Sequence, residues 1–222
     1  MVTVKEQAAF YDTFLDHFIQ QQFNDRNVSF RDWLRKWISS DKGTKVLDVG
    51  CAYGYNTAWL QHDFGAMVAG VDLSPKCIKA AKERYPECYW FAGDITDSSA
   101  AVIPEELTEF NAIVMSDVIE HVPLNKHLDL FNNLSRLCKL GGFIIGSVPS
   151  FEYYEEIKKT TVQPVEEKVL LGELFSTLYI SGFRRVHSLF LYDQIYYRFV
   201  VQKTIELVDL IPKEFIDVIG NS

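Results

Sequence analysis

Short apolar runs alternate with longer amphipathic segments along most of the chain, starting at about residue 44. Five of the runs predict β-strands: KVLDV (45–49), MVAGV (67–71), CYWFA (88–92), NAIVMS (111–116) and FIIGSV (143–148). Nearly continuous apolar runs are typical of strands buried on both faces, as in a parallel sheet that helices cover on either side. The pattern therefore predicts an α/β core.

Two segments between these runs carry clear helix signals. SPKCIKAAKERY (74–85) begins with a serine N-cap followed by proline at the first helical position. NKHLDLFNNLSRLCK (125–139) places apolar residues at helical spacing. We expect the glycine pair at 141–142 to end this second helix.

Two β-rich runs, FRRVHSLFLYD (183–193) and IYYRFVVQK (195–203), lie too close together for a helical crossover. They should therefore pair antiparallel, as a hairpin at one edge of the sheet. The predicted fold class is α/β. We expect a Rossmann-like, doubly wound, mostly parallel seven-stranded sheet with an antiparallel edge hairpin and an N-terminal helical extension.

Amphipathic segments flank this core on both sides. FYDTFLDHFIQQQF (10–23) and SFRDWLRKWI (29–38) predict helices before the first strand, and TIELVDLIPKEFIDVI (204–219) predicts another after the hairpin, broken at Pro212. For a chain of 222 residues we expect a single domain, 1–222. It divides into a helical N-terminal extension or lid (1–43), a core (44–203) and a helical tail (204–222).

Composition narrows the function classes. With 48% hydrophobic residues and no apolar run long enough to cross a bilayer, the chain reads as a water-soluble protein without a membrane partner. The first residues do not resemble an export signal, so we expect a cytoplasmic location. The 30 acidic residues outnumber 22 basic ones, and the formal charge of −8 favours a small-molecule partner over nucleic acid. The sequence makes no prediction of the oligomeric state.

The four cysteines include no C-x-x-C pair, which argues against a zinc site or a disulfide scaffold.

The turn after the first strand, VLDVGCAYGYN (46–56), places Asp48 two residues before Gly50 and Gly54 four residues after it. A dinucleotide fingerprint would need glycine where the chain has Ala52 and Tyr55, and a phosphate-binding loop would need a G-K-[ST] ending. Asp48 would also repel a phosphate. We therefore expect a ligand that carries a positive charge at this turn.

S-adenosyl-L-methionine (SAM) is such a ligand, since it has an ammonium, a sulfonium and no phosphate. Asp48-Val-Gly50-Cys-Ala52-Tyr-Gly54 resembles the first motif of the class I SAM-dependent methyltransferases, [DE]-x-G-x-G-x-G, and departs from it only at Ala52. Residues 44–203 would then be the SAM-binding core.

The next two strands also end in acids, in the positions of the family's second and third motifs. Asp72 can accept hydrogen bonds from the ribose hydroxyls, and Asp94 can accept one from the adenine amino group between the apolar side chains of Leu73 and Ile95. The alternative for each acid alone is a helix cap or a turn former. The resemblance implies the following cofactor-binding residues: Asp48, Gly50, Cys51, Ala52, Gly54, Asp72, Leu73, Asp94, Ile95 and Ser116.

The segment after the fourth strand, MSDVIEHVP (115–123), resembles that of small-molecule methyltransferases, including ubiquinone-biosynthesis-like O-methyltransferases. Because the sulfonium already activates the methyl group, the protein must align the acceptor and remove its proton. His121 is the candidate base, and the alternative is a histidine that only packs at a helix start.

Asp117, Glu120 and His121 form a D-x-x-E-H cluster, and similar families with E-x-x-E-H bind a divalent metal. The shorter aspartate argues against a metal here, and we assign none.

Aromatic side chains concentrate in segments expected to overhang the carboxyl ends of the strands. Among them we select Tyr11 and Tyr154 as substrate-binding residues, the alternative being that these rings only pack in the core. The stretch PVEEK (164–168) reads as the solvated start of a helix without a chemical role.

The resemblance predicts methyl transfer from SAM to an oxygen or nitrogen atom of a small acceptor, with S-adenosyl-L-homocysteine (SAH) as product. The alternatives are a SAM-binding sensor or scaffold without transfer, a nucleic-acid or protein methyltransferase and, less favoured, an aminopropyl transferase. SDVIEH does not match the [DNS]-P-P-[YFW] motif that clamps a base.

Overall fold

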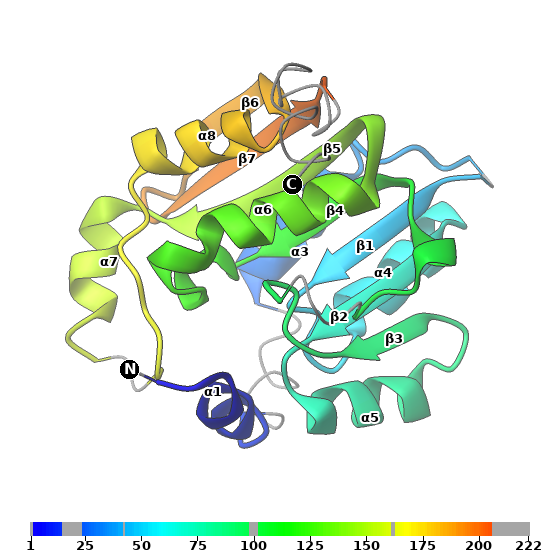
Figure 1. Ribbon diagram of the computed structural model, residues 1–222, viewed down its shortest axis with the longest axis horizontal. Helices are drawn as coiled ribbons and strands as arrows, with labels where there is room; N and C mark the ends of the chain where they lie inside the picture. The colour runs from blue at the N-terminus through cyan, green and yellow to red at the C-terminus, as the bar shows by residue number, and fades with distance from the viewer. Residues whose placement is uncertain (1, 15–23, 42, 98–101, 161–162, 206–222) are drawn as a thin grey trace, which may run out of the picture.

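The computed structural model describes residues 2–14, 24–41, 43–97, 102–160 and 163–205, which build one twisted sheet with helices on both faces (Figure 1). The strands are β1 (Lys45–Val49), β2 (Met67–Asp72), β3 (Tyr89–Ala92), β4 (Phe110–Ser116), β5 (Cys138–Pro149), β6 (Phe183–Tyr192) and β7 (Tyr196–Lys203). Their order in the sheet is β3-β2-β1-β4-β5-β7-β6. The predicted α/β fold is confirmed.

Strand order explains where a ligand can approach. β1 pairs in parallel with both β2 and β4, so the chain builds outward from β1 first in one direction and then in the other. In such a sheet the carboxyl ends of the strands diverge at this reversal and leave room for a ligand. The predicted hairpin is also confirmed, because β7 pairs antiparallel with both β5 and β6.

Alternate residues of the strands enter two separate cores. In β1, Leu47 and Val49 pack with the helices α6 (His127–Leu137) and α8 (Leu171–Ile180) on one face of the sheet. Val46 packs on the other face with α3 (Asp25–Leu34) and α4 (Tyr55–Phe64). This two-residue alternation is the geometry of a strand covered on both sides, and it accounts for the continuous apolar runs.

The remaining helices cap the ends of the sheet. α5 (Pro75–Arg84) packs against β2 and β3 and begins as predicted, with Ser74 accepting a hydrogen bond from the Cys77 N–H (3.0 Å). α7 (Phe151–Ile157) follows β5, and single turns of 3-10 helix lie at Glu105–Leu107, Ile119–His121 and Leu124–Lys126.

The glycine pair at 141–142 does not end a helix. α6 stops at Leu137, and Cys138 already pairs with Phe110 of β4, so both glycines lie inside β5. A Cβ on Gly142 would lie 2.8 Å from the Cys138 Sγ and 2.9 Å from the Phe110 carbonyl oxygen. Close backbone approach at an irregular pairing explains the glycine better than helix termination does.

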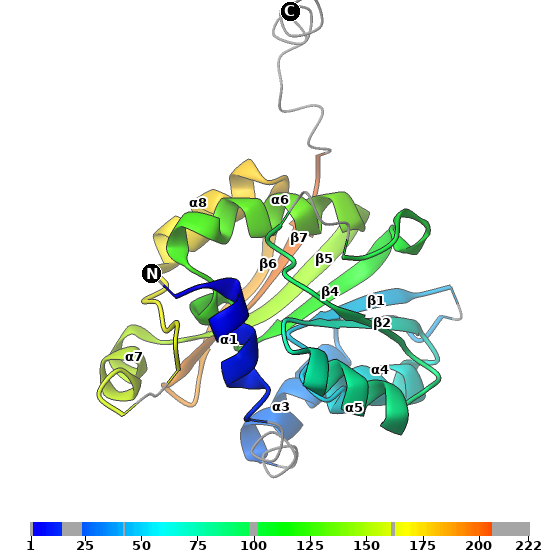
Figure 2. The same ribbon diagram turned by 60° about the horizontal axis from the view of Figure 1, so that its bottom comes forward.

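The N-terminal extension is helical, with bounds that differ from the prediction. α1 (Val4–Tyr11) starts earlier, at a capping box between Thr3 and Glu6, and α3 starts at Asp25 rather than at residue 29. Residues 15–23 and most of the predicted C-terminal helix, from residue 206 onward, lie outside the described residues. In Figure 2, α1 runs across the molecule between α7 and α5.

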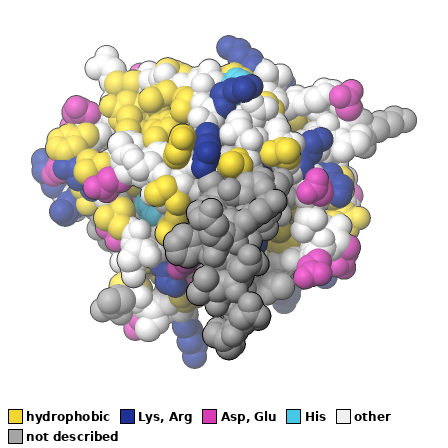
Figure 3. Space-filling view, turned by 45° about the horizontal axis from the view of Figure 1, so that its top comes forward, with side chains coloured by type: hydrophobic (Ala, Val, Ile, Leu, Met, Phe, Trp, Pro, Cys, Tyr) yellow, Lys and Arg dark blue, Asp and Glu magenta, His cyan; other side chains and the backbone are white. Residues whose placement is uncertain are grey.

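The opposite edge strand from β3 presents an apolar surface. β6 exposes Val186, Leu189 and Leu191, and the end of α8 exposes Tyr179 and Ile180. Figure 3 shows hydrophobic side chains gathered over this part of the surface. None of the described helices combines the length and apolar character required to span a membrane.

Candidate cofactor and acceptor site

The turn between β1 and α4 folds back over the end of β2. The N–H groups of Gly50 and Cys51 both donate to the Val71 carbonyl oxygen (2.8 and 3.1 Å). Gly50 and Gly54 have φ values of 69° and 84°, and a Cβ on Gly50 would lie 2.5 Å from a Val118 methyl carbon. Only glycine fits both conditions, so the two glycines of the motif are structural requirements of this turn.

Ala52 stands in the left-handed region as well, with a φ of 48°. Its N–H donates to the Asp72 carboxylate (2.9 Å), which fixes the turn against the end of β2. The backbone therefore has the glycine-like conformation of the motif in spite of the alanine, and the Cβ adds steric strain.

Replacing Ala52 with glycine should raise the free energy of unfolding by about 1 kcal/mol, because glycine adopts a positive φ without steric cost. Urea unfolding measures the change. Ala58→Gly, inside α4, is the matched control and should lower the same free energy by about 1 kcal/mol. If both variants were destabilised alike, the strain at Ala52 would be refuted.

Asp48 is buried beneath this turn, with 4% of its surface exposed. The Thr57 hydroxyl donates to its carboxylate (2.6 Å). Burial raises the pKa of Asp48 to about 7, against the opposing effect of the Thr57 hydrogen bond. A cation bound above the turn would favour the ionised form, so Asp48 is suited to a positively charged ligand.

Asp72 holds two backbone segments together. One carboxylate oxygen accepts from the Ala52 N–H and the other from the Ser74 N–H (2.8 Å). Burial raises the pKa of Asp72, while these two hydrogen bonds lower it. Each oxygen keeps a second lone pair, so two hydroxyl donors can still bind.

Asp94 has a local partner, because one of its oxygens accepts from both the N–H (2.9 Å) and the hydroxyl (2.7 Å) of Thr96. The turn-forming role considered from the sequence is thus present in the structure. Leu73, Ile95 and Ser116 are half-buried, and Cys51 is buried. Of the predicted set, the structure brings Asp72 into direct contact with the 50–54 turn, while Asp48 is bound by Thr57 of α4.

The loop after β4 approaches from the other side of β1. Asp117 has a φ of 56°, accepts from the Ser147 hydroxyl (2.8 Å) and pairs with Arg26 of α3 (2.9 Å). His127 holds the same loop from behind, with its Nε2 at 3.1 Å from the Ile119 carbonyl oxygen. A strained aspartate fixed by two partners is the kind of feature that clusters at functional sites.

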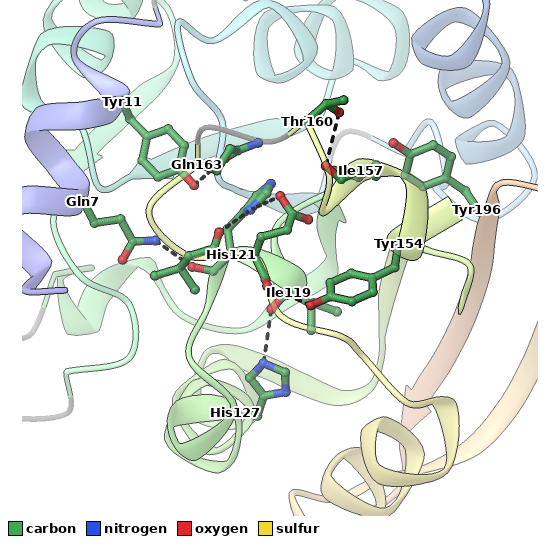
Figure 4. A network of polar contacts seen from close by, with 12 residues as sticks. Gln7, Tyr11, Ile119, His121, His127, Tyr154, Ile157, Thr160, Gln163 and Tyr196 are labelled. Atoms are coloured by element: carbon green, nitrogen blue, oxygen red, sulfur yellow. Dashed lines mark hydrogen bonds and ion pairs between the residues drawn. The ribbon is translucent and has the colours of Figure 1, made fainter. Parts of the chain in front are cut away.

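His121 lies between α1 and residues 163–170, a segment without regular structure that we call the strap (Figure 4). Its Nδ1 is 3.1 Å from the Val165 carbonyl oxygen and 3.8 Å from the Glu166 carboxylate. A carbonyl only accepts, so Nδ1 carries the proton and Nε2 presents a lone pair. Burial lowers the pKa of His121, and this favours the neutral form that a base requires.

The prediction that PVEEK (164–168) is the solvated start of a helix is wrong. Residues 164–168 form no helix, and the Glu166 side chain is only 6% exposed. The Glu167 N–H donates to the Glu120 carbonyl oxygen (2.7 Å), which ties the strap to the β4 loop. The partners are more than forty residues apart in sequence, so no local pattern indicates this contact.

Tyr11 and Tyr154 both bind the strap, Tyr11 at its first residue and Tyr154 near its middle. The Tyr11 hydroxyl donates to the Gln163 side chain (3.0 Å), and its ring lies 6.2 Å from the His121 ring, edge to face. The Tyr154 hydroxyl donates to the Glu166 carbonyl oxygen (3.3 Å), and the residue is 7% exposed. Figure 4 shows Tyr11 beside His121 and Tyr154 on the far side of it.

α1 connects the two halves of the site. The Gln7 side chain donates to the His121 carbonyl oxygen (2.6 Å). One turn later, Asp12 accepts from the Ser74 hydroxyl and from the Lys76 N–H (3.1 Å) at the start of α5. The N-terminal helix therefore contacts both the Asp72 side and the His121 side.

The sequence interpretation gave no role to Arg26 or Glu166, and it considered Glu120 only as part of the D-x-x-E-H cluster. Arg26 pairs with Asp117 and donates to the Tyr196 hydroxyl, Glu166 faces His121, and Glu120 is buried with 2% of its surface exposed. The sequence offered one signal for this part of the site, the acid Glu120 between apolar residues in the segment after β4. Charged residues are almost never fully buried without a role or a partner.

The D-x-x-E-H cluster is not gathered around one point. Asp117 is engaged by Arg26 and Ser147, and His121 turns its Nδ1 to Val165. Among the described residues, no group of three His, Cys, Asp or Glu side chains is placed to hold a metal ion.

The sequence of this chain is similar to those of known methyltransferases. Residues 46–142 match the family described as "Methyltransferase domain". Among curated proteins, the 2-methyl-6-phytyl-1,4-hydroquinone methyltransferase of Synechocystis sp. is 28% identical over 130 residues, which cover 57% of this chain and 40% of that protein. The ubiquinone biosynthesis O-methyltransferase of Leptothrix cholodnii is 29% identical over 115 residues, covering 51% of this chain and 47% of the relative. The matches thus span less than half of either relative.

Among solved structures, a TehB-like SAM-dependent methyltransferase from Corynebacterium glutamicum superposes with a TM-score of 0.68 at 19% identity. The alignment covers 88% of this chain and 99% of that one. At this identity the likeness concerns the fold.

Proposed function

We propose that this chain, whose residues 46–142 match the methyltransferase domain family, transfers the methyl group of SAM to an oxygen or nitrogen atom of a small organic acceptor and releases SAH. The observation that carries the proposal is the half-buried Asp72 carboxylate. It is tied to the Ala52 N–H beside Asp48, at the place where the strand order reverses. We expect the reaction to take place in the cytoplasm.

The cofactor would lie across the ends of β1, β2 and β3. The remaining lone pairs of Asp72 would accept from the ribose hydroxyls, and Asp94, Leu73 and Ile95 would surround the adenine. The methionine carboxylate would meet the N–H groups at the start of α4, where the helix dipole favours an anion. The Asp48 carboxylate would attract the ammonium group of the methionine. Cys51 and Ser116 would line the same turn and the end of β4.

The acceptor would lie on the His121 side, below α1 and the strap. Nε2 of His121 would remove the acceptor proton as the nucleophile attacks the methyl carbon, and the Val165 carbonyl would hold the ring in the required tautomer. Tyr11 would provide one aromatic wall. Tyr154 would act by supporting the strap, since its hydroxyl binds the Glu166 carbonyl.

A SAM sensor that performs no transfer is the second candidate, favoured by the number of contacts that close α1 over the site. Incubation with methyl-labelled SAM and a metabolite extract separates the two. A methyltransferase moves the label into small molecules and forms SAH in equal amount. A sensor binds SAH tightly while the label stays on SAM, and that outcome would contradict the proposed transfer. Label in nucleic acid or protein would point to the macromolecular alternatives.

A further inference from the structure

Glu120 is an unusual buried acid. Only 2% of the residue is exposed, and its Oε2 has no hydrogen-bond partner among the described residues. An unpaired polar atom in the interior costs about 1–3 kcal/mol, and more for a charged group. Native structures rarely retain such a cost without a bound ligand or a chemical role.

The groups around Glu120 are mostly acids. Burial raises the pKa of Glu120 most, and the charges of Asp117 and Glu166 raise it further. A backbone hydrogen bond and the charge of Arg26 lower it. Arg26 is already paired with Asp117 (2.9 Å). His121 lies 3.8 Å from Glu166 but is held neutral by burial. Three acids, Asp117, Glu120 and Glu166, thus lie around a single arginine that already pairs with Asp117.

Aromatic side chains contact the neighbours of Glu120. The Tyr11 ring lies 6.2 Å from the His121 ring, and the Tyr196 hydroxyl accepts from Arg26, the partner of Asp117. Tyr196 is 4% exposed and stacks edge to face with Tyr153 (5.3 Å between centroids). A buried carboxylate with aromatic rings close by is an environment that favours organic cations.

We propose, building on the methyltransferase function above, that the acceptor carries an ammonium group and that Glu120 and Glu166 bind it. An ammonium supplies a positive charge beside the acids and up to three donors, which would satisfy the unpaired Oε2. A hydroxyl acceptor would supply one donor and no charge. A divalent metal fits less well, because Asp117 and the Nδ1 of His121 already have other partners.

Calorimetry on the full chain saturated with SAH tests this inference with matched pairs of probes. The pairs are 2-phenylethylamine with 2-phenylethanol and propylamine with propanol, and Mg²⁺ is titrated alone. We expect the amine of at least one pair to bind about tenfold or more tightly than its alcohol, since a charged hydrogen bond in a buried site is worth at least that factor.

Glu120→Gln should remove the preference for the amine, because it keeps the shape and deletes the charge. Glu166→Gln should reduce it. Glu156→Gln, on the exposed face of α7, is the control and should leave it unchanged. If no amine is preferred over its alcohol, if Mg²⁺ binds at Glu120 instead, or if the preference survives Glu120→Gln, the inference is wrong.

SAH affinity, measured first in each variant, keeps this test separate from the proposed function. Failure of the wild-type chain to bind SAH contradicts the methyltransferase proposal, whereas SAH binding without amine preference contradicts only the acceptor class. The ratio of SAM to SAH affinity should be the same in Glu120→Gln as in the wild type. A changed ratio would make Glu120 the partner of the sulfonium and overturn the inference.

Discussion

Asp72→Asn should weaken the binding of SAH by about a hundredfold or more. Two ribose hydroxyls lose a charged acceptor, and a hydrogen bond to a charged group is worth about 1.5–3 kcal/mol. The asparagine amide also directs an NH2 group at one of the two backbone N–H groups that Asp72 now binds, those of Ala52 and Ser74. The free energy of unfolding should therefore fall by about 1–3 kcal/mol.

Isothermal titration with SAH measures the loss, at a temperature where circular dichroism shows the variant to be folded. Asp129→Asn, an exposed acid on α6 paired only with Lys126, removes the same charge away from the site and should bind SAH normally. Unchanged affinity in folded Asp72→Asn would show that the ribose does not lie on Asp72.

His121→Asn should lower kcat by about 10²–10⁴, the range that a positioned base contributes. The asparagine NH2 can still donate to the Val165 carbonyl, so the loop should keep its shape and the KM for SAM should change little. The measurement is the steady-state rate with the acceptor that the labelling experiment identifies. His62→Ala, with a side chain 91% exposed on α4, is the control.

The pH profile gives His121 a signature that a structural role would lack. The base is active when neutral, and burial lowers its pKa below the ordinary value of 6.5. Activity should therefore be near its maximum at pH 7 and fall only at a pH below the ordinary value of 6.5, as the imidazole becomes protonated. His121→Asn should lose this acidic limb. A variant that keeps both the rate and the limb would remove His121 from the chemistry.

The fold was predictable because its signals are local. Each central strand is buried on both faces, so its apolar run is continuous, and Leu47 and Val46 serve opposite cores from adjacent positions. The short spacing of the last two runs required a hairpin, and the Ser74-Pro75 start fixed the beginning of α5.

The errors arose where contacts between distant segments override local patterns. The glycine pair at 141–142 resembles a helix stop, but it lies inside β5, where the close approach of Phe110 and Cys138 requires Gly142. The acidic strap resembles a helix start, but its backbone is bound to His121 and Glu120. Hydrogen bonds between residues more than forty positions apart produce no periodic pattern in the sequence.

The candidate site divides in the same way. Asp48, Gly50 and Gly54 follow one another in a motif, and Asp72 ends the adjacent strand, so spacing alone could place them together. Arg26, Glu166 and Tyr196 come from α3, the strap and β7, and only the folded chain brings them to the β4 loop. The contacts of the Asp48 and Asp72 half therefore follow from sequence spacing, whereas the contacts that Arg26, Glu166 and Tyr196 make with the β4 loop and His121 do not.

A crystal structure grown with SAH tests the central claim most directly. The account predicts the adenosine across the ends of β1, β2 and β3, with both ribose hydroxyls on the Asp72 carboxylate and the sulfur directed toward His121. SAH bound elsewhere, or a cleft that takes NAD or ATP and leaves SAH in solution, would contradict it.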